Sequence, residues 1–183
     1  MRRNLNNTAM KTVSISDFAK YVGLSLLNKE LGVSHLKLQK IIYYCQAWHM
    51  VFFGRENTLL KEVPQAWVNG PAYPAVYKKY KKDGDITDPM TKEDFGYSDI
   101  EKGLSELSSK MGLSDQQTEC LDSVISLYGT KNITQLVFLT HSEKPWVEKR
   151  IGLKPYERST EELSLQTMHD YYKERFNRNR AKK

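Results

Sequence analysis

The chain has 183 residues, of which 39% are apolar and 27% are charged, and its formal net charge is +6. This length and composition are typical of one globular domain with a substantial buried core. No apolar run approaches the roughly 20 residues of a membrane-spanning helix, and the polar start of the chain excludes a signal peptide. The charge lies at the ends: residues 1–3 carry +2 and residues 173–183 carry +5, which leaves −1 for the body.

The cysteine pattern indicates a reducing compartment. Cys45 and Cys120 lie far apart, each within an apolar helical pattern, which argues against a disulfide framework. We expect both to be small core residues of a cytoplasmic protein that does not associate with a membrane.

A polar leader, residues 1–12, precedes the first predicted helix. Ser14 with Asp17 three residues later is a variant capping box, and Gly32 is a natural helix end. Apolar residues recur between them at helical spacing: Ile15, Phe18, Ala19, Val22 and Leu26.

Residues 36–52 form the most apolar predicted helix, and we expect the other helices to pack around it. One side, a sector of about 120°, carries Leu38, Ile41, Ile42, Cys45, Trp48 and Phe52. The other side is also apolar, with Tyr43, Tyr44, Ala47 and Val51. The preceding helix and a Gly-Val-Ser turn suggest a helix-turn-helix, but a recognition helix presents polar side chains to DNA bases. DNA reading by this pair is therefore not favoured.

Gly54 ends the central helix, and the residues after it are predicted to be extended. Pro64 interrupts residues 59–67, as in an edge strand, and a short β-hairpin is expected near residues 59–68. Turn residues Asn69, Gly70 and Pro71 follow, and Pro74 opens another helix. The turn lacks the glycine and lysine patterns of nucleotide-binding loops. The basic run 78–82 resembles single-strand binders, although a solvated helix end is favoured.

The remaining elements are predicted from caps and periodicity. Residues 83–110 are polar and irregular, which indicates an insertion or mobile loop. Ser114 and Gln117 form a capping box for a helix ending at Gly129. A helix over residues 133–140 follows, then a short helix that contains Trp146, with Ser142 as its expected cap. The last helix begins near residue 164 and ends in a basic flexible tail, residues 177–183.

Catalytic and metal-binding patterns are absent from the sequence. The four histidines have no partner at a recognised metal spacing, and no nucleophile elbow occurs. The neighbours His141 and Ser142 suit helix capping better than acid–base catalysis. We therefore expect no metal, no cofactor and no enzymatic activity; an enzyme centred on His141 is the less favoured alternative.

Three ordered sequence blocks resemble a known family. They are Leu36-Lys37-Leu38-Gln39-Lys40-Ile41-Ile42-Tyr43-Tyr44-Cys45-Gln46-Ala47, then Ala66-Trp67-Val68-Asn69-Gly70-Pro71-Ala72-Tyr73-Pro74-Ala75-Val76-Tyr77, and Thr140-His141-Ser142-Glu143-Lys144-Pro145-Trp146. They resemble the Panacea domain of SocA-like antitoxins and GepA-type phage-associated proteins. Ile41 and Ile42 stand where leucine is usual, and Ala72-Tyr73 stands where valine and a small residue are common. The resemblance covers residues 13–176 and predicts a mainly α, compact single-domain bundle.

The resemblance implies a bacterial or prophage antitoxin that binds and neutralises a cognate toxin encoded by a neighbouring gene. Two alternatives stay open: an adaptor that delivers the toxin to a protease, and a nucleic-acid-binding regulator that uses the basic tail. Neither neutralisation nor delivery requires a catalytic residue.

The candidate toxin-binding residues are the aromatic and turn residues of the three blocks. They are Tyr43, Asn69, Gly70, Pro71, Tyr73, Tyr77, His141 and Trp146. Tyrosine and tryptophan are frequent interface hot spots, although packing between blocks is the favoured role of Trp48 and Trp67. We expect residues 69–74 and 141–146 to meet near the second side of the central helix. Tyr73→Ala and His141→Ala are expected to weaken neutralisation while leaving the protein folded.

Overall fold

The computed structural model of the protein describes residues 10–182, so most of the expected leader lies outside the described residues. The α-helices are α1 (Ile15–Asn28), α2 (His35–Phe53), α3 (Pro74–Tyr80), α4 (Ile100–Met111), α5 (Asp115–Gly129), α6 (Ile133–Ser142), α7 (Lys144–Val147) and α8 (Leu165–Ala181). The strands are β1 (Gln65–Trp67) and β2 (Gly70–Ala72), and the 3₁₀ helices are η1 (Lys92–Phe95) and η2 (Glu148–Arg150). The expected mainly α fold with a short hairpin is therefore confirmed.

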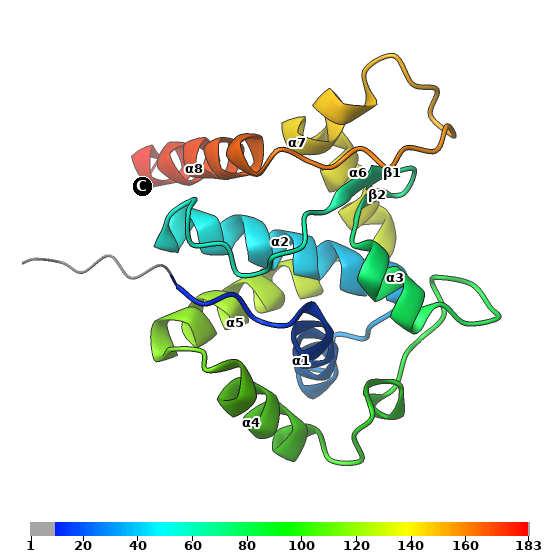
Figure 1. The fold of residues 1–183 in the computed structure, drawn as a ribbon, viewed down its shortest axis with the longest axis vertical. Helices are drawn as coiled ribbons and strands as arrows, with labels where there is room; N and C mark the ends of the chain where they lie inside the picture. Colours follow the sequence, from blue (N-terminus) through cyan, green and yellow to red (C-terminus); the bar gives the residue numbers. More distant parts are fainter. Residues whose placement is uncertain (1–9, 183) are drawn as a thin grey trace, which may run out of the picture.

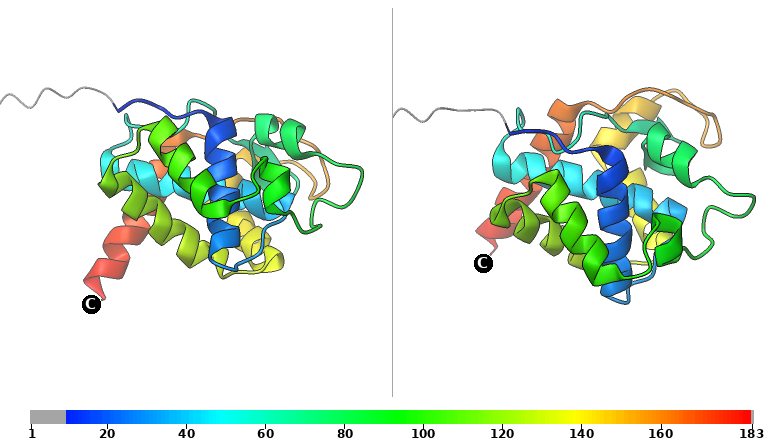
Figure 2. Two further views of the ribbon diagram at one scale, coloured as in Figure 1. Left: turned by 90° about the horizontal axis from the view of Figure 1, so that it is seen from below. Right: turned by 60° about the horizontal axis from the view of Figure 1, so that its bottom comes forward.

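Helix α2 is the centre of the bundle, as its two apolar sides predict. Helix α8 covers one side of it and α1 and α5 cover the other, while α4 packs beside α1 (Figures 1 and 2). Sixteen of the 19 residues of α2 are buried. A recognition helix needs an exposed face to enter a DNA groove, and α2 has none.

The last turn of α2 departs from the predicted pattern. Phe52, assigned above to the core side, is 52% exposed. It stacks on Trp48, with ring centroids 6.1 Å apart, and meets the edge of Phe176. Phe52 therefore packs against its own helix and α8, while half of its side chain stays exposed.

The helix boundaries follow the predicted caps at several points. The Ser14 hydroxyl accepts a hydrogen bond from the Asp17 amide, and Ser114 and Gln117 form a reciprocal capping box. Gly54 ends α2 with a positive φ of 98°. These local interactions satisfy backbone groups that a helix end leaves unpaired.

The expectation of an irregular segment over residues 83–110 is wrong in its second half. Helix α4 occupies residues 100–111, and the Asp99 side chain caps its N-terminus by accepting from the Lys102 amide. Ile100, Leu104 and Leu107 follow the 3.6-residue period and face the core. The apolar stripe of α4 is narrow, and serine and charged residues surround it. The overall composition of the segment therefore does not indicate a helix.

The hairpin lies a few residues beyond its expected position. Strands β1 and β2 are antiparallel, with Gln65 opposite Ala72 and Trp67 opposite Gly70. The segment 161–163 runs beside them: the Ala66 amide donates to Glu161 and the Leu163 amide donates to the Pro64 carbonyl. The hairpin is thereby held between α2 and the segment that precedes α8.

Two predictions near the C-terminal blocks are also corrected. Ser142 is the last residue of α6 and donates to the Leu139 carbonyl, so it does not cap the following helix. Pro145 lies in the first turn of α7, where a backbone N–H would have no partner within the helix, so the missing N–H of proline costs no hydrogen bond. Helix α8 continues to Ala181, so most of the expected tail is helical, although its side chains beyond Phe176 are exposed.

Within residues 10–182, the longest helices lack the apolar length that a bilayer crossing requires.

Candidate functional site

The first two sequence blocks meet through Gln39, which is buried on α2. Its side-chain oxygen accepts from the Tyr73 amide at 2.8 Å, and its nitrogen donates to the Tyr73 carbonyl at 3.2 Å. The side chain thus satisfies both backbone groups of Tyr73, as a neighbouring strand would.

Lys40 makes a second connection to the same hairpin. Its side chain is fully buried, and Nζ donates to the Pro71 carbonyl at 2.9 Å. Gly70 lies against it with a φ of +97°, and a Cβ there would approach Thr140 Oγ1 to 2.6 Å and Lys40 Nζ to 2.9 Å. Both the conformation and the space therefore require glycine. Burial lowers the pKa of Lys40 to about 7.

The third block packs on the hairpin from α6 and α7. Trp146 donates its indole N–H to the Trp67 carbonyl at 2.9 Å. The His141 ring stacks on Trp146, with centroids 4.0 Å apart and planes inclined by 7°. The Arg150 guanidinium lies 5.3 Å from the Trp146 ring and donates to the Ala66 carbonyl. Desolvation, followed by the charges of Lys40 and Arg150, lowers the pKa of His141 and so favours the neutral ring.

Glu143 joins the third block to α2 and α8. It is buried, accepts from the hydroxyls of Tyr44 at 3.2 Å and Tyr172 at 2.6 Å, and pairs with Arg175 at 3.0 Å. Burial nevertheless outweighs these partners and raises the pKa of Glu143 to about 6. The three blocks are therefore held together by a buried polar network as well as by apolar packing.

The structure brings most of the candidate residues together, but some of them are buried and others are exposed to solvent. Tyr43 and Tyr73 are fully buried, and Gly70 and Pro71 are buried in the hairpin. These residues support the site from within. The expectation that Tyr73→Ala leaves the fold intact is therefore not supported, because deleting a buried tyrosine side chain creates a large cavity.

The remaining candidates reach the surface around the hairpin. Asn69 is exposed at the turn, and the side chains of Tyr77, His141 and Trp146 are partly exposed. The loop 69–74 contacts α2 where Lys40 donates to the Pro71 carbonyl, and the 141–146 corner contacts the strand before that loop, where Trp146 donates to the Trp67 carbonyl.

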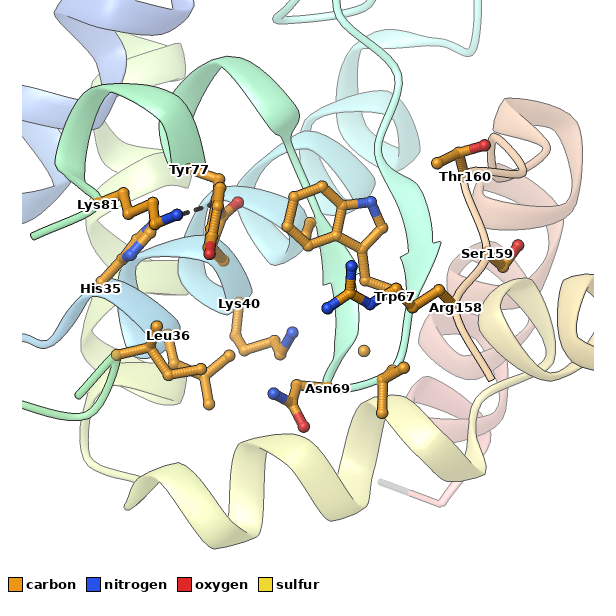
Figure 3. A pocket seen from close by; sticks show the side chains of 15 residues that line it. His35, Leu36, Lys40, Trp67, Asn69, Tyr77, Lys81, Arg158, Ser159 and Thr160 are labelled. Carbon is orange, nitrogen blue, oxygen red and sulfur yellow. Dashed lines mark hydrogen bonds between the residues drawn. The ribbon is translucent and has the colours of Figure 1, made fainter. Parts of the chain in front are cut away.

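A cavity of about 540 Å³ lies beside this corner, between α2, α3, the hairpin and the loop after η2 (Figure 3). Its lining residues are His35, Leu36, Gln39, Lys40, Trp67, Val68, Asn69, Gly70, Ala72, Tyr77, Lys81, Ile86, Arg158, Ser159 and Thr160. Three of these are lysine or arginine, and among the described residues that line the cavity none is aspartate or glutamate. The cavity is therefore positively charged.

Exposed apolar side chains gather in the segment that follows the hairpin contact. Within the described part of the chain, six large apolar side chains are exposed, and four of them fall in residues 138–156. They are Phe138 at 72%, Val147 at 41%, Ile151 at 79% and Tyr156 at 74% exposure. Exposed large apolar side chains mark interaction surfaces where they form one patch, which makes this segment a candidate.

The geometry offers little for catalysis by His141. The Ser142 hydroxyl is directed to the Leu139 carbonyl of its own helix, and the His141 ring lies flat on Trp146. Across residues 10–182, histidine, cysteine, aspartate and glutamate do not gather in threes that would hold a metal ion.

Several residues of the site are missing from the list of candidates drawn from the sequence. Arg150 and Arg175 lie outside the three blocks, and the groups that join them to the site, the Ala66 carbonyl and Glu143, are distant in the chain, so spacing gives no signal for them. Gln39, Lys40 and Glu143 lie inside the blocks. A signal existed for these three, because polar residues within an otherwise apolar pattern are usually paired when buried.

Comparison with known proteins assigns the class of this protein. The family described as Antitoxin SocA-like, Panacea domain matches residues 38–147, which contain all of the second and third blocks and most of the first. The chain belongs to this family. A curated relative, Antitoxin SocA of Caulobacter vibrioides (strain NA1000 / CB15N), is 30% identical over 135 residues, which are 70% of this chain and 68% of the relative. No solved structure matches the chain.

Proposed function

We propose that this protein is an antitoxin that neutralises its cognate toxin, the product of a neighbouring gene, by direct protein–protein binding. Membership of the SocA-like antitoxin family and the similarity to Antitoxin SocA support the antitoxin role. Direct binding is the mechanism that best suits a corner held together by buried contacts and surrounded by exposed apolar side chains.

The observation that carries this proposal is the position of the exposed segment 138–156. It begins on α6, includes α7 and η2, and contains the Trp146 and Arg150 side chains that contact the hairpin. Exposed apolar side chains on a rigid support lose little freedom when a partner covers them. We assign this face, with Asn69 and Tyr77 at its border, as the toxin-binding surface.

The size of the required contact is consistent with several elements taking part. A stable protein–protein interface buries on the order of 1,600 Å² in total, more than the hairpin turn supplies alone. Helix α6, α7 and the loop after η2 therefore contribute most of the contact. Phe138 and Ile151 are the expected hot spots, because they are, together with Tyr156, the most exposed large apolar side chains of the segment.

The test is rescue of cells that express the toxin encoded beside this gene. Phe138→Asp and Ile151→Asp are expected to abolish rescue, while Leu127→Asp, at an apolar site on α5 that is 58% exposed, is expected to retain it. Thermal unfolding of each purified variant separates loss of binding from loss of folding. Full rescue by both Phe138→Asp and Ile151→Asp would exclude this face as the binding surface.

A further inference from the structure

The cavity beside the hairpin contains a buried cation without a matching anion. Among the described residues, the one hydrogen-bond acceptor of Lys40 Nζ is the Pro71 carbonyl, and no carboxylate forms a salt bridge with it. An ammonium has three donors, so two remain for a group inside the cavity. A buried lysine is costly unless something compensates its charge.

A second cation enters the same space from a different element. Figure 3 shows the Lys40 and Arg158 side chains reaching toward each other from opposite sides of the cavity. Arg158 is exposed on the loop after η2, whereas Lys40 lies at the buried end. A phosphate suits this pair, because a guanidinium binds it with two parallel hydrogen bonds and an ammonium binds it as a point charge.

Aromatic rings form another part of the wall. Trp67 and Tyr77 are both partly exposed and meet edge to face, with centroids 5.0 Å apart. Tyr77 also packs against the His35 ring, with centroids 5.1 Å apart, and Lys81 Nζ lies 5.9 Å from the Tyr77 ring. Trp67 is therefore the ring available to a planar ligand. The volume of about 540 Å³ falls in the range of small-molecule sites.

We propose that this cavity binds a small organic phosphate with a planar ring, of the mononucleotide class. Lys40 and Arg158 bind the phosphate, and the ring stacks on Trp67. The site needs no glycine-rich phosphate loop, since the charge comes from side chains. The proposal is tested apart from toxin binding, because Lys40 and Arg158 line the cavity and neither is one of the exposed apolar side chains assigned to the toxin.

Proton uptake is a distinctive property of this site. A bound phosphate stabilises the ammonium form of Lys40, whose pKa in the free protein is about 7. The titratable and charged groups around it are His35 on α2, Tyr77 on α3, Lys81 after α3, His141 on α6, Arg150 on η2 and Arg158. Burial and the charge of Lys40 lower the pKa of His35, and burial with the charges of Lys40 and Arg150 lowers the pKa of His141.

Calorimetry on the full chain tests the proposal with adenosine 5′-monophosphate as the probe. Inorganic phosphate lacks the ring and adenosine lacks the charge, so both are expected to bind at least about tenfold more weakly. Affinity for the probe is expected to fall roughly fivefold as pH rises from about 7 to about 8, because the protonated fraction of Lys40 falls by that factor, with proton uptake seen in buffers of different ionisation enthalpy.

Variants locate the site. Lys40→Met is expected to abolish binding and its pH dependence, and Arg158→Ala is expected to weaken binding about tenfold or more. Arg158 is exposed, so its substitution leaves the fold intact. Arg178→Ala, an exposed arginine on α8, serves as the matched control and is expected to bind as the native protein does. The proposal would be overturned if the native protein failed to bind the probe, or if Lys40→Met and Arg158→Ala bound it as tightly as the native protein does. Either result holds whether or not the toxin binds.

Discussion

Gln39 and Tyr73 exchange two hydrogen bonds across 34 residues of sequence. The side-chain amide of Gln39 meets the backbone N–H and C=O of Tyr73 just before Pro74 opens α3. A glutamine side chain here takes the place of a third strand. The path of the hairpin, and with it one wall of the cavity, is therefore set by a residue of the central helix.

Gln39→Leu removes this arrangement at nearly constant side-chain volume. Both backbone groups of Tyr73 then lose a buried partner, so the free energy of unfolding is expected to fall by about 2–4 kcal/mol. Urea unfolding measures the change. Gln116→Leu, at an exposed position of α5, is the control and should alter stability by no more than about 0.5 kcal/mol. A Gln39→Leu protein as stable as the native one would show that the pairing is dispensable.

Gly70→Ala tests the close approach of the hairpin to α2 and α6. The added methyl group meets Thr140 Oγ1 and Lys40 Nζ in addition to an unfavourable φ. Gly96 has a similar φ of +81°, but a Cβ added there would have no atom within 4 Å, so Gly96→Ala is the matched control. The first variant is expected to be less stable than the second by about 1–3 kcal/mol, measured by chemical unfolding. Equal losses would mean that backbone conformation alone requires glycine at residue 70.

Glu143 is expected to make stability depend on pH. Its pKa is raised to about 6 in the folded protein from an ordinary 4.5, so the protonated carboxyl favours folding. This stabilisation is complete below about pH 4.5 and is lost as pH rises through about 6, a change of about 2 kcal/mol. The stability of the native protein relative to Glu143→Gln should therefore decrease by this amount between about pH 4 and pH 7. An increase over that range would mean that Arg175 outweighs burial.

His141 is expected to act on neutralisation by holding Trp146. His141→Ala removes the stacked ring and should weaken toxin rescue, while the partly exposed position keeps the protein folded. His141→Phe retains a flat ring and should restore rescue if stacking is the relevant contact. Rescue in cells is compared with thermal unfolding of both variants. If rescue fails only in variants that also unfold, His141 is a scaffold residue.

The central helix and most caps are predictable from the sequence because they depend on local chemistry. The apolar sides of residues 36–52 require burial, and Ser114 with Gln117 satisfies nearby amides. Helix α4 is concealed by its narrow apolar stripe, and Phe52 is misassigned because periodicity does not show where the neighbouring helices end.

The site itself is only partly predictable. The blocks identify which segments matter, and their aromatic residues suggest a surface. Yet Tyr43 and Tyr73 are core residues, whereas Lys40 faces a cavity. The roles of Arg150 and Arg175 in the site become visible only when distant chain segments are brought together. Arg150 reaches the Ala66 carbonyl, 84 residues away, and Arg175 reaches Glu143, 32 residues away.

Direct binding is tested most plainly by mixing the purified protein with the purified toxin from the neighbouring gene and measuring association by calorimetry. The account predicts a tight complex with the native protein and with Leu127→Asp, and its loss with Phe138→Asp and Ile151→Asp. The account would be contradicted if the native protein showed no detectable binding to the toxin and rescue in cells persisted only while a protease is present. That result would favour delivery of the toxin for degradation.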